Sequence, residues 1–337
     1  MAMERVPYLV GGGFEHSAEV MRAMLAASTS GAEGIVTAGD FKVRPLSVPG
    51  TSVRVAPGNA LIRNSYGGGQ AQTYACRAGS ETEVPIEATG SAGSRTDLIV
   101  ARIDDPTYQG GAFDPLTFEA ARFEVIRGVP ASTKTVAGLG LTYPAIPLAR
   151  VTLPKSTGTV TAAMITDLRF LAQPRKERHL FVHPLSRADE VQYLSDTRDI
   201  GDWWPSPLVT GWTVDVPSWA QRVRIVGQIG GVLLRGGEVG DAEARGRFWA
   251  RIGSQYDGTG IDAEPVEWNL DTSQISHTRE AWLTGADRSV PAALRGQEGV
   301  MVGVRGRVDY RRGSTPLPEL NYLSVVTLDL EFYETAV

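Results

Sequence analysis

Two carboxylates followed by two adjacent tryptophans make residues 199–204 the part of this sequence best suited to binding chemistry. Asp199 and Asp202 precede Trp203 and Trp204, and glycines and prolines surround them in a loop-like stretch. Aromatic faces stack on sugar rings, and carboxylates accept hydrogen bonds from sugar hydroxyls. The stretch therefore predicts a saccharide-binding loop, although the interpretation that we favour is that both indoles close one end of a β-sandwich.

Trp249 is the second candidate for a binding role. Alternation along residues 247–252 places its side chain with those of Arg247 and Arg251, opposite three apolar residues. An outward indole between two guanidinium groups is typical either of a cation–π cluster or of an anchor for a ligand or partner. Trp268, in contrast, alternates in phase with its apolar neighbours and is expected in the core.

Paired carboxylates are also the catalytic groups of glycoside hydrolases, which makes Asp104 with Asp105, and Asp199 with Asp202, candidates for that chemistry. Aspartate also caps turns and tolerates unusual backbone angles, and this explains all four positions without catalysis. We therefore expect no catalytic residue and no enzyme activity.

Metal and nucleotide motifs are incomplete in this sequence. His179 and His183 are four residues apart, but Pro184 favours an extended segment and no glutamate completes an HExxH pattern. The glycine runs at 11–13 and 67–69 lack the Lys-Ser or Lys-Thr of a phosphate-binding P-loop. We expect no metal and no cofactor.

Composition indicates a soluble globular protein rich in turns, because 38 glycines and 20 prolines favour tight turns over long helices. Cys76 is the only cysteine, which excludes an intrachain disulfide. Residues 1–172 contain 15 basic and 15 acidic side chains, and residues 173–337 contain 18 and 23. Neither half is basic, so we expect no nucleic-acid partner. Apolar runs are too short for a secretory signal or membrane insertion, which predicts synthesis in the cytoplasm.

Residues 16–28 form the best helix candidate. Ser17 is suited to the N-cap, and Glu19 in the first turn complements the helix dipole. Met21, Met24 and Leu25 fall on one apolar side, and they are the candidate interface residues of the chain. Packing against its own domain is the default expectation for such a helix, and packing against a neighbouring subunit is the alternative.

Short β-strands and Pro-Gly turns fill residues 39–170. The segment 98–103 is apolar on both sides and is therefore expected at the centre of a sheet. The strand predicted over 146–153 contains Pro147 and is flanked by prolines, which predicts an edge position or an irregular crossing.

The clearest linker is residues 173–180, a polar, charged segment with a proline at a change of composition. It divides an N-terminal helical segment (1–36) and a β domain (37–172) from a Trp-rich domain (181–337). Strand-like segments in the last domain predict an antiparallel β-sandwich or jelly roll. In its final strand, Val326, Leu328, Leu330 and Phe332 share one side, as in a half-buried antiparallel strand. The whole chain is predicted to be mainly β.

Three strings in the first β domain resemble minor tail and upper-baseplate-type structural proteins of tailed bacteriophages of high-GC Gram-positive hosts. They are VRVAPGNALIR at 53–63, RTDLIVARIDD at 95–105, and YPAIPLARVTLP followed by ITDLR within 143–169. The resemblance covers about 130 of 337 residues. It implies a structural protein at the tail tip or baseplate of a virion, with the first domain joining tail components and the second facing outward. It also implies other tail proteins as partners and a homo-oligomer in multiples of a trimer or hexamer.

Two alternatives remain open from the sequence. A host-cell carbohydrate-binding receptor protein would use the Trp-rich domain, with a host-surface glycan as partner, and an exposed aromatic groove with acidic neighbours would favour it. A cell-wall-degrading tail enzyme would need a cleft with two carboxylates at the separation that glycosidases use. A flat apolar surface would favour the structural role.

Overall fold

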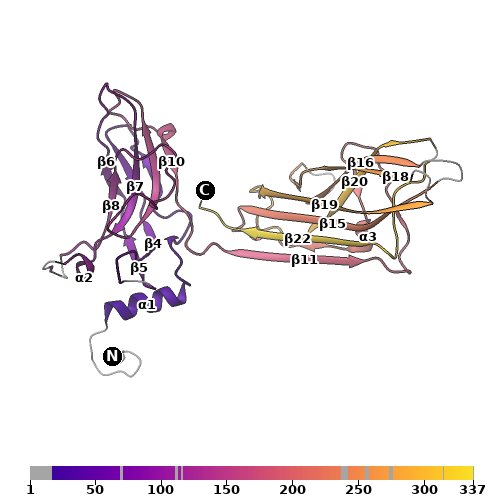
Figure 1. Ribbon diagram of the computed structural model, residues 1–337, viewed down its shortest axis with the longest axis horizontal. Coiled ribbons are helices and arrows are strands. Elements are labelled where there is room, and N and C mark those ends of the chain that lie inside the picture. Colours follow the sequence, from indigo (N-terminus) through magenta and orange to yellow (C-terminus); the bar gives the residue numbers. More distant parts are fainter. Residues whose placement is uncertain are drawn as a thin grey trace. The chain divides into compact units, whose positions relative to one another are not determined.

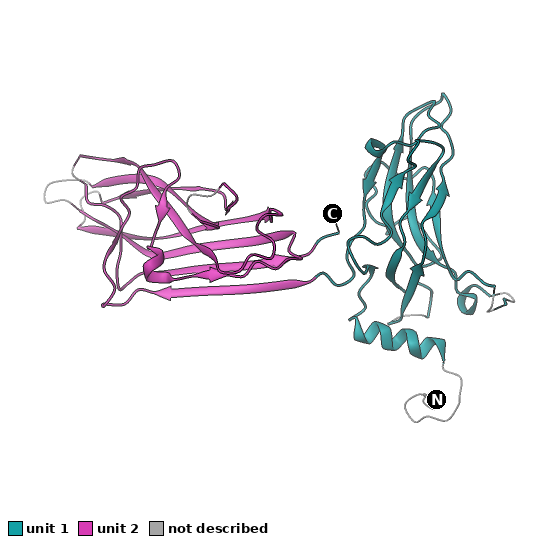
Figure 2. Ribbon diagram, turned by 180° about the vertical axis from the view of Figure 1, so that it is seen from behind, with its two compact units in different colours: residues 1–174, 335–337 teal, residues 175–334 magenta. Residues whose placement is uncertain are grey.

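The computed structural model describes residues 17–68, 71–110, 113–114, 117–236, 242–254, 258–272, 276–313 and 315–336. The chain is mainly β, as its alternation predicts, and it divides into two compact units (Figures 1 and 2). Unit 1 comprises residues 1–174 and 335–337, and unit 2 comprises residues 175–334. Within the described ranges, no helix has the length and apolar character needed to cross a membrane.

Unit 1 contains three small antiparallel sheets. The first has the strand order β1 (Gly34–Ile35), β4 (Gly58–Arg63), β5 (Thr73–Ala78). The second has the order β2 (Val43–Pro45), β3 (Ser52–Val55), β6 (Thr82–Pro85). The third has the order β10 (Ile165–Asp167), β9 (Ala145–Leu153), β7 (Arg95–Ile103), β8 (Ala121–Ile126). The helical segments are α1 (Ala18–Ser28), α2 (Pro106–Gln109) and the 3-10 turn η2 (Ala162–Met164).

Strand β7 is central, which confirms the prediction from its two apolar sides. It pairs with β9 on one edge and with β8 on the other. Ile99 and Ala101 face the main core of unit 1, whereas Leu98 and Val100 face a smaller cluster on the other side. Burial on both sides explains why polar residues do not alternate along this strand.

The strand around Pro147 is not an edge strand as a whole, because β9 lies between β7 and β10. The alternative prediction, an irregular crossing, is confirmed, since β10 pairs with residues 149–151 of β9 and Pro147 lies beyond them, opposite Val100 of β7. The register shifts between Ile99 and Val100 at this point, so the ladder carries a bulge beside the proline. A bulge accommodates a residue that has no N–H to donate, and this permits a proline inside the sheet.

The N-terminal helix begins and ends close to its predicted limits. The Ser17 hydroxyl accepts a hydrogen bond from the Val20 N–H at 3.4 Å, which confirms the predicted N-cap. The predicted boundary between an N-terminal segment and a domain at residue 37 is wrong, however. Strand β1 pairs with β4, and Ile35 is completely buried in the core of unit 1.

Unit 2 is built from two antiparallel sheets. One has the order β11 (Lys176–Pro184), β22 (Val325–Tyr333), β15 (Arg222–Arg235), β21 (Glu319–Leu320), β12 (Gln192–Tyr193), with β19 (His277–Ser289) also paired to β15. The other has the order β13 (Asp202–Trp203), β20 (Val300–Arg311), β16 (Glu243–Ile252), β17 (Ile261–Asp262), with β14 (Thr213–Val214) on β20 and β18 (Val266–Asp271) on β16. A single-turn helix, α3 (Pro207–Thr210), follows β13.

The core of unit 2 lies between these sheets, as in the predicted β-sandwich. Its two apolar clusters each combine residues of β15 and β22 with residues of β16 and β20. Strand β22 confirms the predicted alternation, since the four apolar side chains share the core face and are fully buried: Val326, Leu328, Leu330 and Phe332. Trp268 is also in this core.

The predicted linker over 173–180 is too long. The boundary falls between Pro174 and Arg175, and residues 176–184 form β11, which pairs along its whole length with β22. Of the charged residues that suggested a linker, Lys176 and Arg178 are exposed positions of this alternating edge strand, and Glu177 is half-buried. The chain crosses the boundary a second time at residue 334, and Ala336 packs against the core of unit 1.

Candidate functional site

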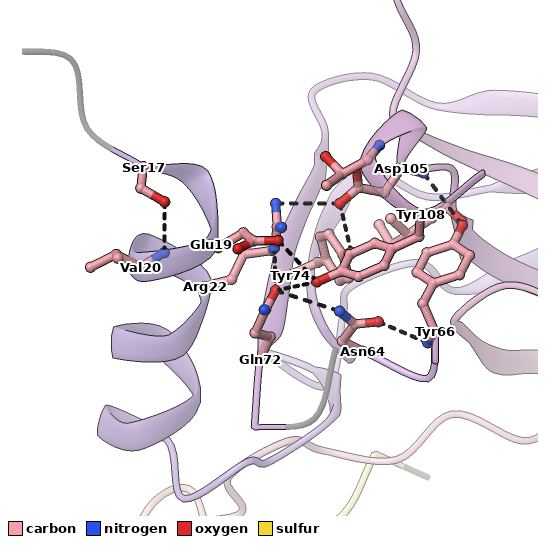
Figure 3. Close-up of polar contacts among 12 residues, drawn as sticks. Ser17, Glu19, Val20, Arg22, Asn64, Tyr66, Gln72, Tyr74, Asp105 and Tyr108 are labelled. Carbon is pink, nitrogen blue, oxygen red and sulfur yellow. Dashed lines mark hydrogen bonds and ion pairs between the residues drawn. The ribbon is translucent and has the colours of Figure 1, made fainter. Parts of the chain in front are cut away.

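A polar cluster fastens α1 to unit 1 (Figure 3). The Arg22 guanidinium lies 3.3 Å from Asp105, donates to the Gln72 amide oxygen at 2.7 Å, and stands over the Tyr74 ring at 5.0 Å. Tyr74 donates to the same Asp105 carboxylate at 2.8 Å. Tyr108 completes the cluster beneath Arg22. The polar attachment of the helix is therefore made through a partly buried arginine.

Asp105 carries the charge that this attachment requires. Burial alone raises the pKa of Asp105, but hydrogen bonds from Tyr74 and Thr107 and the charge of Arg22 outweigh burial and lower it. Burial, reinforced by the Asp105 charge, raises the pKa of Tyr74, which stays a neutral donor. Asp105 also caps α2 by accepting from the Thr107 N–H at 2.9 Å. Its neighbour Asp104 pairs with Arg102 and, at 3.2 Å, with Arg122.

The candidate interface residues of α1 lie on its outer side or at the margin of the contact. Met21 and Met24 are 48% and 42% exposed, and Leu25 is half-buried. Ala26 is the buried residue of the helix, and Arg22 lies on the same side. The default expectation, packing on its own domain, is confirmed for the Arg22 side, and the methionines remain on the surface.

Asp105→Asn is expected to loosen α1. The substitution removes the charge that pairs with Arg22, and a charge-assisted hydrogen bond contributes about 1.5–3 kcal/mol. Amides of residues 20–28 should lose roughly tenfold in hydrogen-exchange protection at pH 7, whereas those of β7 should not change. Equal protection of α1 in both proteins would contradict the attachment.

The same contact predicts a pH dependence with a defined sign. Because the pKa of Asp105 in the folded protein lies below its ordinary value of 3.8, the contribution of Asp105 to the stability of the α1 attachment is complete above about pH 5. This contribution is lost as the pH falls through the pKa of Asp105 in the folded protein. Protection factors of α1, which correct for the intrinsic pH dependence of exchange, should fall on acidification in the native protein and change less in Asp105→Asn.

In unit 2 the indoles of Trp203 and Trp204 are buried, which corrects the hypothesis of an exposed sugar-stacking platform. Trp204 is 2% exposed, lies in the core between the sheets, and donates through Nε1 to the Gln192 carbonyl at 2.9 Å. Trp203 packs against Gly303 on the other face of the second sheet. The favoured interpretation, that these rings fill the sandwich, holds for Trp204, whereas Trp203 is buried outside the sandwich core, on the outer face of the second sheet.

Trp249 lies in a cross-strand row that the sequence alone did not reveal. In the second sheet Arg305 of β20 stands opposite Trp203 of β13 on one side and opposite Trp249 of β16 on the other. The Arg305 guanidinium carbon lies 5.7 Å from the Trp203 ring and 5.6 Å from the Trp249 ring. The predicted cation–π cluster therefore exists, but its cation comes from the neighbouring strand.

A cleft of about 630 Å³ opens over this row. Arg247, Arg251, Arg305 and Arg307 line it together with Trp249, Asp199 and Asp262. It is formed on the outer face of β16 and β20, where Arg247 stands opposite Arg307. Of the predicted site residues, Asp199 and Trp249 are thus brought together here.

Gly201 closes one side of the cleft and can only be glycine. Its φ is +61°, and a Cβ there would lie 2.6 Å from the Trp249 ring and 2.9 Å from the Gly306 carbonyl oxygen. The Gly201 carbonyl accepts from Arg305 Nη2 at 3.0 Å. This close approach holds the 199–202 loop, and hence Asp199, at the rim of the cleft.

The lining arginines differ in their partners. Arg251 lies 2.7 Å from Asp262, and Arg307 pairs with Asp199 and, at 2.7 Å, with Asp309. Arg247 lies 3.5 Å from both Glu267 and Asp309. Arg305 is different because no carboxylate of the described residues lies within 4 Å of it. Its one side-chain hydrogen bond within the same ranges goes to Gly201, and its buried Nε has no acceptor.

Burial lowers the pKa of Arg305, and the positive charge of Arg251 lowers it further. Asp262, Asp202 and Asp196 act in the opposite direction from a greater distance. The Arg305 residue is 2% exposed, so its charge is removed from water without a contacting counter-charge. Such an arrangement costs free energy, and an anion bound in the cleft would offset it.

The sequence contains a signal for this site, but the signal can be interpreted only when the strand pairing is known. Arginines alternate at 305 and 307 in β20, and at 247 and 251 around Trp249 in β16. Alternation assigns each set to one side of its strand. It does not state which strands are neighbours, and the register between them decides that the sets meet.

No family model and no curated protein matches this sequence. Among solved structures, the chain is similar to the VP2 subviral particle of infectious bursal disease virus, with 9% identity and a TM-score of 0.24. That alignment covers 95% of this chain and 78% of the other. A structure of the Gx strain of the same virus gives 12% identity, a TM-score of 0.24, and coverage of 94% and 77%. These values are too low to carry an argument about this chain.

Proposed function

We propose that this chain is a structural protein of a virus particle, and specifically a minor tail or upper-baseplate protein of a tailed bacteriophage. In this role unit 1 joins components at the tail tip, and unit 2 is the outward domain. The observation that carries the proposal is where the three resembling strings lie. They supply β3, β4, β7, β9 and β10, and these strands contribute most of the buried residues in the main core of unit 1.

The surface of unit 2 supports an assembly role. Five exposed apolar side chains lie on the outer face of the β11, β22, β15 and β19 sheet, at Leu180, Val182, Val226, Leu283 and Val325. Polar side chains of Asp329, Thr327 and Gln228 stand between them, so the face is mixed. Mixed apolar and polar surfaces are typical of non-obligate contacts with other proteins. The proposed partners are other tail proteins and further copies of this chain.

The carboxylate pairs give little support to the enzyme alternative. Asp104 and Asp105 are engaged by arginines and by the α2 cap. Asp199 pairs with Arg307, and Asp202 accepts from the Trp203 N–H at 2.8 Å. A structural role without catalysis is therefore the function that we propose.

The outer side of α1 provides a direct test of tail attachment. Met21→Glu places a charge at an exposed position, so the fold should be kept while docking against an apolar partner surface is lost. We expect complementation of a phage lacking the gene to give particles with at least tenfold less of this chain. Immunoblots of purified particles and negative-stain images with bound antibody measure the outcome.

Ala27→Glu is the matched control, because it adds the same charge at another exposed position of the same helix. It should incorporate normally. If the native chain is absent from purified particles, the proposed function fails altogether. If Met21→Glu incorporates as well as Ala27→Glu, the docking surface is not this side of α1.

A further inference from the structure

We propose that the cleft over β16 and β20 binds a small ligand that carries an oxyanion, either a carboxylate or a phosphate ester, on a hydroxylated carrier. The anion would contact Arg305 at the floor of the cleft. This inference does not rest on the proposed function, because it concerns binding by the isolated chain.

The first argument is the state of Arg305. A guanidinium offers five N–H donors in a planar fork, and the described residues accept from only one of its nitrogens, Nη2. Its Nε is buried without an acceptor. Arginine is the side chain best matched to the paired oxygens of carboxylate and phosphate groups. A buried arginine with unused donors and no contacting carboxylate among the described residues can therefore receive acceptors from outside the chain.

The second argument is the charge and size of the cleft. Four arginines and two aspartates line it, and Glu267 and Asp309 pair with Arg247 and Arg307 from beside the lining, so Arg305 is the lining arginine that has no contacting carboxylate among the described residues. A volume of about 630 Å³ lies within the range typical of small-molecule sites. Asp199 at the rim has a side chain that is 99% exposed, and its oxygens can accept hydrogen bonds from hydroxyl groups. These features suit an acidic sugar or a sugar phosphate better than a neutral sugar.

Thermal unfolding followed by tryptophan fluorescence tests the inference in the full chain. All seven tryptophans lie between residues 203 and 282, so the signal reports unit 2 alone. The probes are sodium glucuronate, glycerol 3-phosphate, inorganic phosphate and neutral glucose, each at the same ionic strength. A ligand at a hundred times its Kd should raise the melting temperature of unit 2 by about 5–10 °C. Glucose should have no effect, and the response to each anion distinguishes carboxylate from phosphate ligands.

Arg305→Met separates a ligand-binding role from a structural one. Methionine fills the space between Trp203 and Trp249 without a charge, so the melting temperature without ligand should be unchanged or higher. The response to the anion should be lost. Arg178→Met is the matched control, since it removes the same charge from an exposed position on the other sheet, and it should respond normally.

Asp199→Asn gives a test that does not depend on a buried substitution. It removes a negative charge at the rim and leaves Arg307 with Asp309 as its remaining carboxylate partner, so the anion concentration for a half-maximal shift should fall about threefold to tenfold. The inference is overturned if no anion raises the melting temperature of the native protein. It is also overturned if Arg305→Met keeps the response or if Asp199→Asn weakens it.

Discussion

Leu328→Asp is expected to unfold unit 2, with a loss of more than about 4 kcal/mol in the free energy of unfolding. Leu328 is completely buried between the two sheets, among other apolar side chains of β22 and β15. An aspartate at this position would place a carboxylate where no donor or cation is available in the surrounding cluster. Tryptophan fluorescence during a denaturant titration should show the cooperative transition of unit 2 shifted to much lower denaturant or absent.

The neighbouring residue provides the control for this substitution. Asp329 faces outward, where its carboxylate lies 2.5 Å from Arg178 in an exposed ion pair. Asp329→Leu should cost less than about 1 kcal/mol, because exposed ion pairs contribute little. If Asp329→Leu were the more damaging of the two, the assignment of the two faces of β22 would be wrong.

Arg169→Met is expected to destabilise unit 1 by about 3–5 kcal/mol. The Arg169 side chain is fully buried, forms two hydrogen bonds to Asp167 at 2.9 and 2.7 Å, and donates to the carbonyl oxygens of Ala38 and Asp40 at 2.8 and 2.6 Å. Its loss leaves a carboxylate and two carbonyl groups without their donor. Calorimetry should show one of two transitions lowered, while the tryptophan-detected transition of unit 2 stays in place.

Two further variants give this prediction its controls. Arg169→Lys should recover only part of the stability, because an ammonium group cannot reproduce the planar set of four hydrogen bonds. Arg44→Met removes a charge from an exposed position of β2 and should change stability by less than about 0.5 kcal/mol. An unchanged unit 1 transition in Arg169→Met would show that these contacts do not hold the loop at residues 38–40.

These contacts give a physical reason for the last string of the phage resemblance. In ITDLR, Asp167 orients Arg169, and Arg169 fastens the end of β10 to the loop before β2. The string thus marks a structural requirement of the fold. Residues within it are poor candidates for catalysis because their polar atoms are already used.

Strands with a regular pattern could be predicted from the sequence. Alternation in β22 gave the buried face correctly, and two apolar sides placed β7 at the centre of its sheet. In both cases the local pattern reflects the same cause, which is burial on one side or on both. The N-cap of α1 was also predictable, because capping depends on residues close in sequence.

Features that depend on distant pairing could not be predicted. Pro147 is tolerated because β9 itself carries a bulge there, with Leu148 as the extra residue between the partners of Ile99 and Val100, and only the pairing with β7 reveals it. The charged start of β11 resembled a linker because its exposed edge is polar. The cleft arises from the pairing of Trp203 and Trp249 with Arg305 across three strands. Carboxylates and indoles near Trp203 drew attention to the right region, whereas the arginine at its centre was missed.

The chain passes from unit 1 into unit 2 and back again, so unit 2 is a domain inserted into unit 1 that another domain could replace. Its first strand begins at Lys176 and its last strand ends at Tyr333, and these two residues stand opposite each other in an antiparallel pair. Cα atoms in such a pair are about 5 Å apart. A different domain with equally close ends could therefore replace residues 175–334 while the strands of unit 1, on both sides of the insertion, keep their connections. The second unit can thus change in a single recombination event without redesign of the first.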